Sequence, residues 1–167
     1  MSSKTCSTKY PGLQIDEQLC LKLHRASNRF YGRYDRLLRS HGLTFSEYIV
    51  LVVVWERGPV SEGELARQLQ FDPYTLEDTM LSLERGRLIQ RHADPGRESY
   101  AMVVATPASF ELQPALEAAR AQFLCDSGLP DADWRALGAL LDKMSAALAG
   151  MELDHLDAAA AADLPRN

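Results

Sequence analysis

Apolar residues recur at helical spacing along most of the chain, which predicts a mainly helical protein. The first predicted helix covers residues 16–39. Its apolar side consists of Leu19, Leu23, Ala26, Phe30 and Leu37. These positions form one stripe on a helix, and we expect that stripe to be buried. His41 and Gly42 end the helix.

A nearly continuous apolar run covers residues 48–55. The β-branched residues in this run are typical of a strand. Thr44 and Glu47, however, have the spacing of a capping box, in which each side chain binds the other residue's backbone amide. The cap and the length of the run favour a buried helix over residues 44–57.

Two short helices with clear starts come next. Ser61 and Glu64 form a second capping box, which begins a helix that ends near residue 69. Asp72 caps a further helix that runs to about residue 86, with Pro73 at its first position. Two short helices joined by a turn of a few residues are typical of a helix-turn-helix.

Alternating and β-branched residues then predict two strands, over residues 88–92 and 99–104, with a turn at residues 94–97. A β-hairpin directly after a helix-turn-helix is a wing. The fold class that we predict is therefore mainly α, a winged helix-turn-helix lobe over residues 44–105 with helices on both sides.

The C-terminal part is predicted to contain a helix over residues 107–126, which Pro114 kinks or breaks, and a last helix over residues 131–149. The last helix has an apolar side made of Trp134, Leu137, Leu140, Leu141, Met144 and Leu148. So small a lobe cannot cover this apolar surface, and a symmetric homodimer would bury it. We therefore expect dimerisation helices in residues 13–43 and 106–149, a flexible arm in residues 1–12 and a flexible tail in residues 150–167.

Composition places the chain among ordinary globular proteins. It has 167 residues, of which 46% are hydrophobic and 25% charged. No segment has the roughly 18 uncharged apolar residues that a membrane span needs. The N-terminus has no apolar signal-peptide core, so we expect a cytoplasmic protein without a membrane partner.

Cys6, Cys20 and Cys125 are far apart and odd in number, so they form neither a disulfide framework nor a zinc motif. In a reducing compartment any disulfide would be transient and regulatory. From its position alone, Cys20 has two interpretations, a small buried hydrophobe or a reactive thiol. No Ser/His/Asp or metal-ligand constellation indicates an enzyme, and we expect neither a metal nor another cofactor.

The chain resembles the MarR family of dimeric winged-helix transcriptional regulators, and within it the organic-hydroperoxide-sensing repressors (the OhrR type, two-cysteine subgroup). The resemblance extends over about residues 13–149. It is carried by residues 16–20, Gly42-Leu43-Thr44, Glu47-Tyr48, residues 53–56, residues 65–69, Asp72, Thr75-Leu76, Leu83-Glu84 and Leu88-Ile89.

The resemblance implies a repressor that binds double-stranded operator DNA and has an organic hydroperoxide as its inducer. In that family, the cysteine at the position of Cys20 is the peroxidatic thiol. The position of Cys125 is that of a resolving cysteine, which forms a disulfide with the oxidised thiol of the other subunit. Such chemistry needs a reachable thiolate, and a helix N-terminus favours negative charge.

The resemblance also implies residues around the thiol. Tyr34 matches a family tyrosine that approaches the thiol from the partner subunit. It lies 14 residues after Cys20, or about 21 Å along the helix, so it can reach a thiol only across a dimer. Phe45 stands where the family has a second tyrosine, which removes that hydroxyl. His24 is an additional donor or a surface histidine, and Tyr31 lies on the same side of the helix.

The second helix of the helix-turn-helix would enter the DNA major groove. The residues predicted to face DNA are Tyr74, Thr75, Glu77, Asp78 and Ser82 of this helix and Arg91 and Arg97 of the wing. Leu81 stands where the family commonly has lysine, and Ser99 where it has the wing arginine. Five basic and eight acidic residues between Pro59 and Ala105 give a net charge of −3, which is unfavourable near phosphates.

Two other functions therefore remain open. One is a MarR-type regulator that a small aromatic ligand controls. The other is an interaction protein that keeps the fold but has weakened DNA binding. A carboxylate can still accept a hydrogen bond from a cytosine amino group, so the acidic helix does not exclude DNA.

Overall fold

The structure, a computed structural model, describes residues 10–94 and 97–149. The chain divides into two compact units, residues 1–121 and residues 122–167. The predicted flexible tail, most of the predicted arm, and Cys6 lie outside the described residues.

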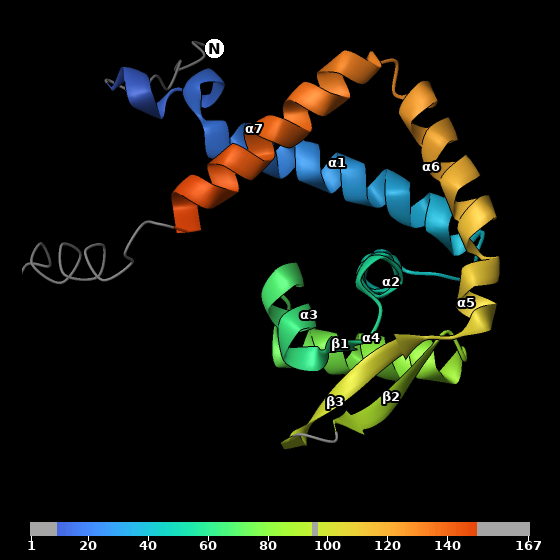
Figure 1. Cartoon of the computed structure of the whole chain (residues 1–167). Helices are drawn as coiled ribbons and strands as arrows, with labels where there is room; N and C mark the ends of the chain where they lie inside the picture. The colour runs from blue at the N-terminus through green and yellow to red at the C-terminus, as the bar shows by residue number, and fades with distance from the viewer. Residues whose placement is uncertain (1–9, 95–96, 150–167) are drawn as a thin grey trace, which may run out of the picture. The chain divides into compact units, whose positions relative to one another are not determined.

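The unit of residues 1–121 contains a helical lobe with a three-stranded sheet (Figure 1). In chain order the elements are η1 (Pro11–Leu13), η2 (Ile15–Glu17), α1 (Leu19–Arg39), α2 (Phe45–Arg57), β1 (Val60–Ser61), α3 (Glu62–Leu69), α4 (Pro73–Arg85), β2 (Ile89–Asp94), β3 (Arg97–Ala105), α5 (Pro107–Glu111), α6 (Gln113–Asp126) and α7 (Asp131–Ala149). The prediction of a mainly α, winged helix-turn-helix fold is confirmed.

Both predicted capping boxes are present. Thr44 accepts a hydrogen bond from the Glu47 amide, and the Glu47 carboxylate accepts one from the Thr44 amide at 2.6 Å. Ser61 and Glu64 make the same reciprocal pair at the start of α3. These side chains satisfy amides that have no partner inside a helix, which explains why α2 and α3 begin where they do.

The apolar run after Thr44 is a helix, as predicted, and it forms the centre of the core. Val50 and Leu51 of α2 have no exposed surface. The other fully buried large side chains come from several elements and include Leu38, Leu65, Met80, Leu83, Ile89 and Val103. The lobe therefore closes around α2, with α3, α4 and the sheet packed against it.

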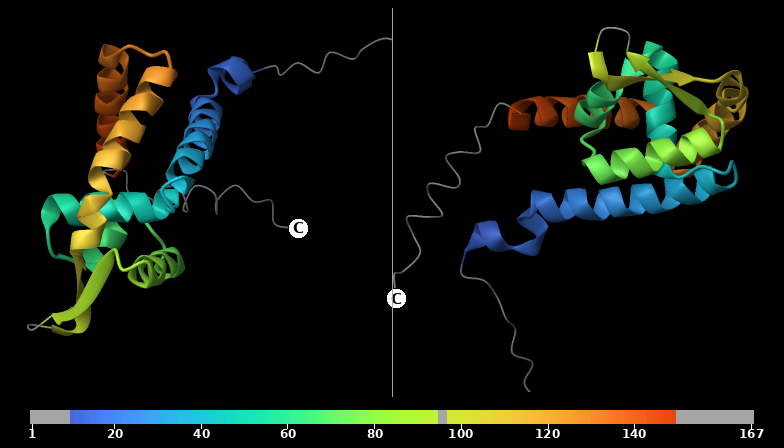
Figure 2. Two further views of the ribbon diagram at one scale, coloured as in Figure 1. Left: turned by 90° about the vertical axis from the view of Figure 1, so that its right-hand side faces the viewer. Right: turned by 90° about the horizontal axis from the view of Figure 1, so that it is seen from below.

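The sheet has the order β1-β3-β2, and all its neighbours are antiparallel. The β2–β3 hairpin extends away from the helices of the lobe (Figure 2), in the manner of a wing. Both strands are longer than predicted. The two-residue strand β1 was not predicted, because its pairing of Val60 with Val103 joins positions far apart in the chain.

The prediction for the first helix needs two corrections. The helix begins at Leu19, not at Asp16, because residues 15–17 form a separate 3-10 turn. The predicted stripe is not buried within the chain, since Leu19 is 61% exposed. Tyr34 and Leu38 are the buried residues of α1. Both lie in its C-terminal half, where the turn at residues 40–44 brings the chain back into α2.

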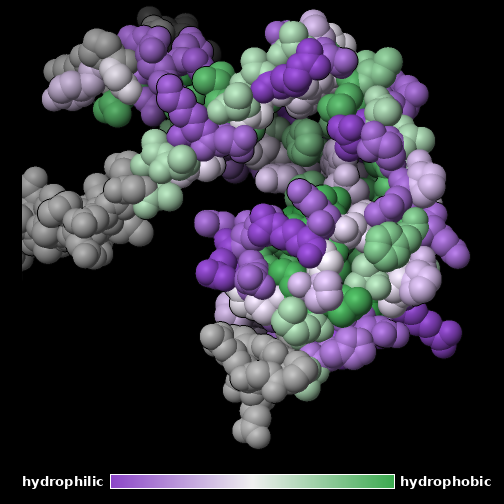
Figure 3. Space-filling model, viewed as in Figure 1, coloured by the Kyte–Doolittle hydropathy of each residue, from purple (hydrophilic) through white to green (hydrophobic). Residues whose placement is uncertain are grey.

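Pro114 accounts for a break in the C-terminal helix, as the sequence predicts. Helix α5 ends at Glu111, and α6 begins at Gln113 with Pro114 at its second position, where a missing amide hydrogen costs nothing. Helix α7 has the predicted bounds, but none of its residues is buried within the chain. Hydrophobic and hydrophilic side chains are mixed on the face of the molecule that Figure 3 shows.

Candidate functional site

Cys20 is the second residue of α1, and its side chain is exposed. The thiol donates a weak hydrogen bond to Oε1 of Gln18 at 3.8 Å, while the amide nitrogen of the same side chain donates to the Gly12 carbonyl. Gln18 is the N-cap residue of α1 but makes no capping hydrogen bond with its side chain. Cys20 therefore lies at the positive end of the α1 dipole, open to solvent. The interpretation of Cys20 as a buried hydrophobe is wrong for the isolated chain.

Cys125 lies in the last turn of α6, and its side chain is also exposed. It belongs to the unit of residues 122–167, whereas Cys20 belongs to the other unit. A disulfide between Cys20 and Cys125 of a second subunit stays a prediction.

Three of the predicted thiol neighbours pack together in an aromatic cluster of the lobe. Tyr34 stacks on Phe30 with ring centroids 5.2 Å apart, and Tyr31 meets Phe45 edge to face at 4.7 Å. Tyr48 of α2 completes the cluster, 5.6 Å from the Tyr34 ring. These rings join the C-terminal half of α1 to the start of α2. The buried residues of α1 lie in this half.

Tyr34 is nearly buried, with 5% of its surface exposed. Its hydroxyl donates a hydrogen bond to the Tyr48 hydroxyl at 3.4 Å. Burial, and then the hydrogen bond with Tyr48, raise the pKa of Tyr34 above its ordinary value. The list of thiol neighbours drawn from the sequence omitted Tyr48. No local pattern in the sequence indicates this pair, because Tyr34 and Tyr48 lie on different helices.

His24 lies one helical turn after Cys20 on the exposed surface of α1. Its Nε2 is 3.0 Å from Nδ2 of Asn28, one turn further on. A neutral ring would accept this hydrogen bond, because an amide nitrogen only donates. His24 is thus the one predicted thiol neighbour that lies near Cys20 on the same chain.

Helix α4 has three faces with different environments. The core face consists of Leu76, Thr79, Met80 and Leu83, all buried. A second face binds Arg91 through Glu77 and Glu84. The outer face consists of the exposed residues Tyr74, Asp78, Leu81 and Arg85. The start of the helix is fixed by Asp72, which accepts hydrogen bonds from the Tyr74 and Thr75 amides at 3.0 Å.

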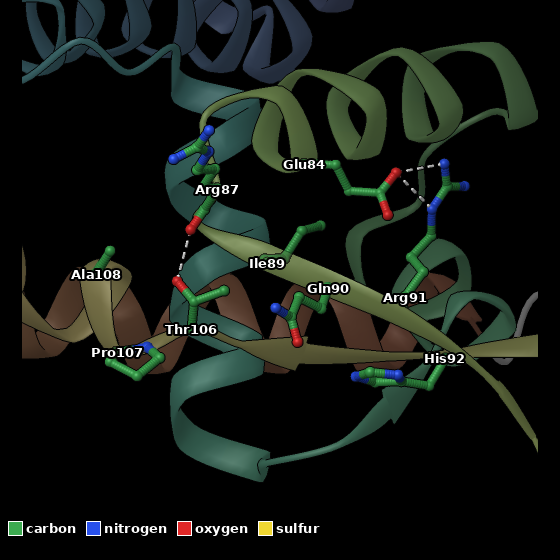
Figure 4. A pocket seen from close by; sticks show the side chains of 9 residues that line it. All are labelled: Glu84, Arg87, Ile89, Gln90, Arg91, His92, Thr106, Pro107 and Ala108. Carbon is green, nitrogen blue, oxygen red and sulfur yellow. Dashed lines mark hydrogen bonds and ion pairs between the residues drawn. The ribbon is translucent and has the colours of Figure 1, made fainter.

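Arg91 of β2 binds three carboxylates, a group that we call the Arg91 cluster. The guanidinium lies 2.7 Å from Glu84, 2.9 Å from Glu77 and 3.3 Å from Glu62 (Figure 4 shows the Glu84 pair). The hydrogen bond with Arg91 lowers the pKa of Glu84, and the carboxylates raise the pKa of Arg91. The cluster ties β2 to α4 and α3. A contact between Arg91 and DNA stays a prediction, but this guanidinium is already occupied by protein carboxylates.

Two open pockets adjoin α4. One, of about 310 Å³, lies between α4 and the start of α2 and is lined by polar residues, among them Ser46, Thr75, Asp78, Ser82 and Arg85. The other, of about 810 Å³, adjoins β2 and the start of α5. In it, Gln90 and His92 point to the side of β2 opposite Glu84 (Figure 4). The side chain of Arg97, predicted to face DNA, lies outside the described residues.

None of the helices in the described residues combines the length and the apolar character needed to cross a membrane. The described residues also contain no group of three or more His, Cys, Asp or Glu residues placed to hold a metal ion.

No protein-family profile matches the chain, but individual proteins do. The HTH-type transcriptional regulator MgrA of Staphylococcus aureus is 26% identical over 133 residues, which are 78% of this chain and 89% of that protein. The structure of reduced AbfR bound to DNA is similar over 80% of this chain and 94% of that chain, with a TM-score of 0.65 and 24% identity. AbfR is a Staphylococcus epidermidis protein.

A third similar protein is Bordetella bronchiseptica BpsR, whose DNA binding is regulated by 6-hydroxynicotinic acid. It covers 79% of this chain and 96% of its own, with a TM-score of 0.70 and 24% identity. At this identity the likeness to solved structures shows the fold. The sequence relatives are HTH-type transcriptional regulators, and the fold shared with the solved structures is a winged helix-turn-helix.

Proposed function

We propose that the protein is a homodimeric DNA-binding repressor that leaves its operator when an organic hydroperoxide oxidises Cys20. The observation that carries this proposal is the exposed Cys20 thiol in the first turn of α1. Solved structures of AbfR include a reduced and an overoxidized form, both bound to DNA. Oxidation thus belongs to the description of one protein with this fold.

The reaction takes place in two steps. The Cys20 thiolate attacks the outer oxygen of the hydroperoxide, and the O–O bond breaks. The sulfur becomes a sulfenic acid, and the alkoxide that leaves takes up the proton that the thiol had released and becomes the alcohol. The thiol of Cys125 from the partner subunit then attacks this sulfur. An S–S bond forms and water leaves. The hydroperoxide is the oxidant of both thiols.

In the DNA-bound state, α4 of each subunit lies in the major groove and the β2–β3 hairpin contacts the flanking backbone or minor groove. Two related half-sites would match a symmetric dimer. Support for a second copy comes from the apolar residues of α7, which no part of the described chain buries. Leu137, Leu140, Leu141 and Leu148 are between 39% and 64% exposed.

Non-reducing electrophoresis after treatment with cumene hydroperoxide tests the thiol chemistry. We expect the wild type to form a cross-linked dimer and to release an operator fragment, and dithiothreitol to reverse both effects. Cys20→Ser and Cys125→Ser should each abolish the cross-link. Cys6→Ser is the matched control and should behave as the wild type. A Cys20→Ser protein that still responds to peroxide would contradict the mechanism.

A second candidate is a regulator controlled by a small aromatic ligand, with the thiols incidental. It is supported by the regulation of BpsR by 6-hydroxynicotinic acid and by the aromatic cluster around Tyr34. A thermal shift with salicylate or 6-hydroxynicotinic acid, equal in wild type and Cys20→Ser, would favour this candidate. If the protein binds no DNA at any salt concentration, the remaining alternative is favoured, an interaction protein that keeps the fold but has weakened DNA binding.

A further inference from the structure

The outer face of α4 contains one carboxylate that is open to a ligand. Asp78 is exposed and makes no hydrogen bond or ion pair with the rest of the described chain. The neighbouring carboxylate of Glu77 is held 2.9 Å from Arg91, and that of Asp72 caps the helix. Of these three acidic residues, Asp72 and Glu77 are therefore held by contacts within the lobe, and Asp78 is free to bind a ligand.

Tyr74 and Leu81, which lie next to Asp78 on the outer face, carry no charge. Tyr74, one turn before it, is 89% exposed and has one hydroxyl. Leu81, three residues after it, is 42% exposed and has no polar side-chain atom. Arg85 lines the same pocket as Asp78, but its Nε donates to the Leu81 carbonyl at 3.2 Å, and within the described residues it forms no ion pair with Asp78. The middle of the outer face thus offers an acceptor and apolar surface.

We propose that Asp78 is a specificity-determining residue that selects cytosine by accepting a hydrogen bond from its N4 amino group. This inference rests on the proposed function, because it requires α4 to lie in the major groove of DNA. Among the four bases, guanine and thymine present only acceptors there. Adenine presents an amino donor beside its N7 acceptor, and the acceptor repels a carboxylate. Cytosine alone presents an amino donor without an adjacent acceptor.

Leu81 supports the same proposal, that this face of α4 contacts bases in the major groove. A leucine one helical turn from Asp78 can contact a thymine methyl group, which is the apolar feature of the major groove. The outer face would then select pyrimidines on the strand that it contacts. A lysine or arginine at these positions would instead favour the O6 and N7 acceptors of guanine.

The test is a selection of duplexes from a random DNA library by the full-length protein, kept reduced with dithiothreitol. Affinities for the selected duplex and its single-base variants follow from fluorescence anisotropy. We expect the wild type to discriminate about tenfold against a C·G to T·A change at one position of each half-site. Asp78→Ala should lose this discrimination at that position alone. Asp78→Asn should prefer adenine there, because an asparagine amide pairs with adenine N6 and N7.

Glu56→Gln is the matched control. It removes one exposed carboxylate from α2 of the same lobe, so it tests the effect of charge alone, and it should keep the cytosine preference. If Asp78→Ala binds the selected duplex and its T·A variant more tightly by the same factor, Asp78 merely repels phosphates and the inference is wrong. A wild-type protein that selects no sequence would contradict the proposed function itself.

Discussion

Tyr34 is a single residue whose environment differs from its predicted role. It was predicted to approach a thiol, and within its own chain it lies in the aromatic cluster with its hydroxyl on Tyr48. Its nearly complete burial favours the neutral phenol. To donate to a partner's thiol, the Tyr34 hydroxyl would have to exchange Tyr48 for sulfur.

The burial of Tyr34 predicts a loss of stability in alkali. Its pKa is raised in the folded protein, so the unfolded chain releases the phenolic proton first as the pH rises above about 10. Stability is full below this pH and decreases above it, by about 1.4 kcal/mol per pH unit for one proton. Urea unfolding between pH 9 and 11 measures the slope. Tyr34→Phe should make this slope smaller by the contribution of about one proton, because the buried phenol is gone. Tyr74→Phe, at an exposed site, should leave the slope unchanged.

At the level of elements, α4 is held at its start by Asp72 and along its side by the Arg91 cluster. The two devices differ in range. Asp72 binds amides two and three residues ahead, whereas Arg91 reaches Glu62, Glu77 and Glu84, which are 29, 14 and 7 residues away. The cap decides where the helix starts, and the cluster decides how it lies against the wing.

The cap can be tested with two variants. Asp72→Ala leaves the Tyr74 and Thr75 amides without an acceptor, and it should lower the urea midpoint of unfolding with an unchanged slope. Asp72→Asn retains an acceptor oxygen and should lose much less. An asparagine variant as unstable as the alanine variant would show that the carboxylate acts by charge and not as a cap.

The Arg91 cluster predicts an acid-dependent contribution to stability. Because Arg91 lowers the pKa of Glu84, the contribution is full above the ordinary glutamate value and is lost as the pH falls below about 4.5. Arg91→Met should lower the free energy of unfolding by about 1–2 kcal/mol at pH 7. The difference from wild type should shrink towards pH 3. A constant difference would indicate packing rather than charge.

The same variant tests whether Arg91 contacts DNA. An arginine that binds a phosphate releases counterions, so its loss reduces the slope of log affinity against log salt by about one. If Arg91 acts by positioning α4 and the wing, Arg91→Met lowers the affinity and leaves the slope unchanged. The three carboxylates on its guanidinium favour the second outcome.

At the level of the whole molecule, α7 presents apolar residues that the described chain does not bury. A helix with five leucine or methionine residues on one side and none of its residues buried is unstable alone in water. A second copy of the chain would bury this surface, as in the proposed homodimer. We expect wild-type protein to sediment as a dimer at micromolar concentration.

Leu140 offers a direct test, because it is 64% exposed and its replacement costs the isolated chain little. Leu140→Glu should shift the sedimentation of the protein to the monomer and lower its melting temperature. Leu81→Gln changes an exposed leucine of α4 instead and should leave the dimer intact. Dimers that persist in Leu140→Glu would place the interface elsewhere.

The sequence was sufficient for elements whose causes are local. The caps at Thr44, Ser61 and Asp72 and the break at Pro114 depend on residues within one or two turns, so the helices of the lobe and their order were predictable. The thiol at the start of α1 was found in the same way. The exposure of this thiol depends on which other elements pack against α1, and the spacing of apolar residues along one helix does not indicate that.

By itself, the sequence determined the order of the winged helix-turn-helix elements and the helices on which Cys20 and Cys125 lie. Capping and periodicity act between near neighbours in the chain, so they can be read without the fold. Only the tertiary structure decided the partners. It placed Arg91 among three carboxylates, Tyr34 against Tyr48, and Val60 beside Val103. It also left Asp78 free while Glu77, the next residue, is bound. Burial and ion pairing depend on segments that meet only when the chain has folded.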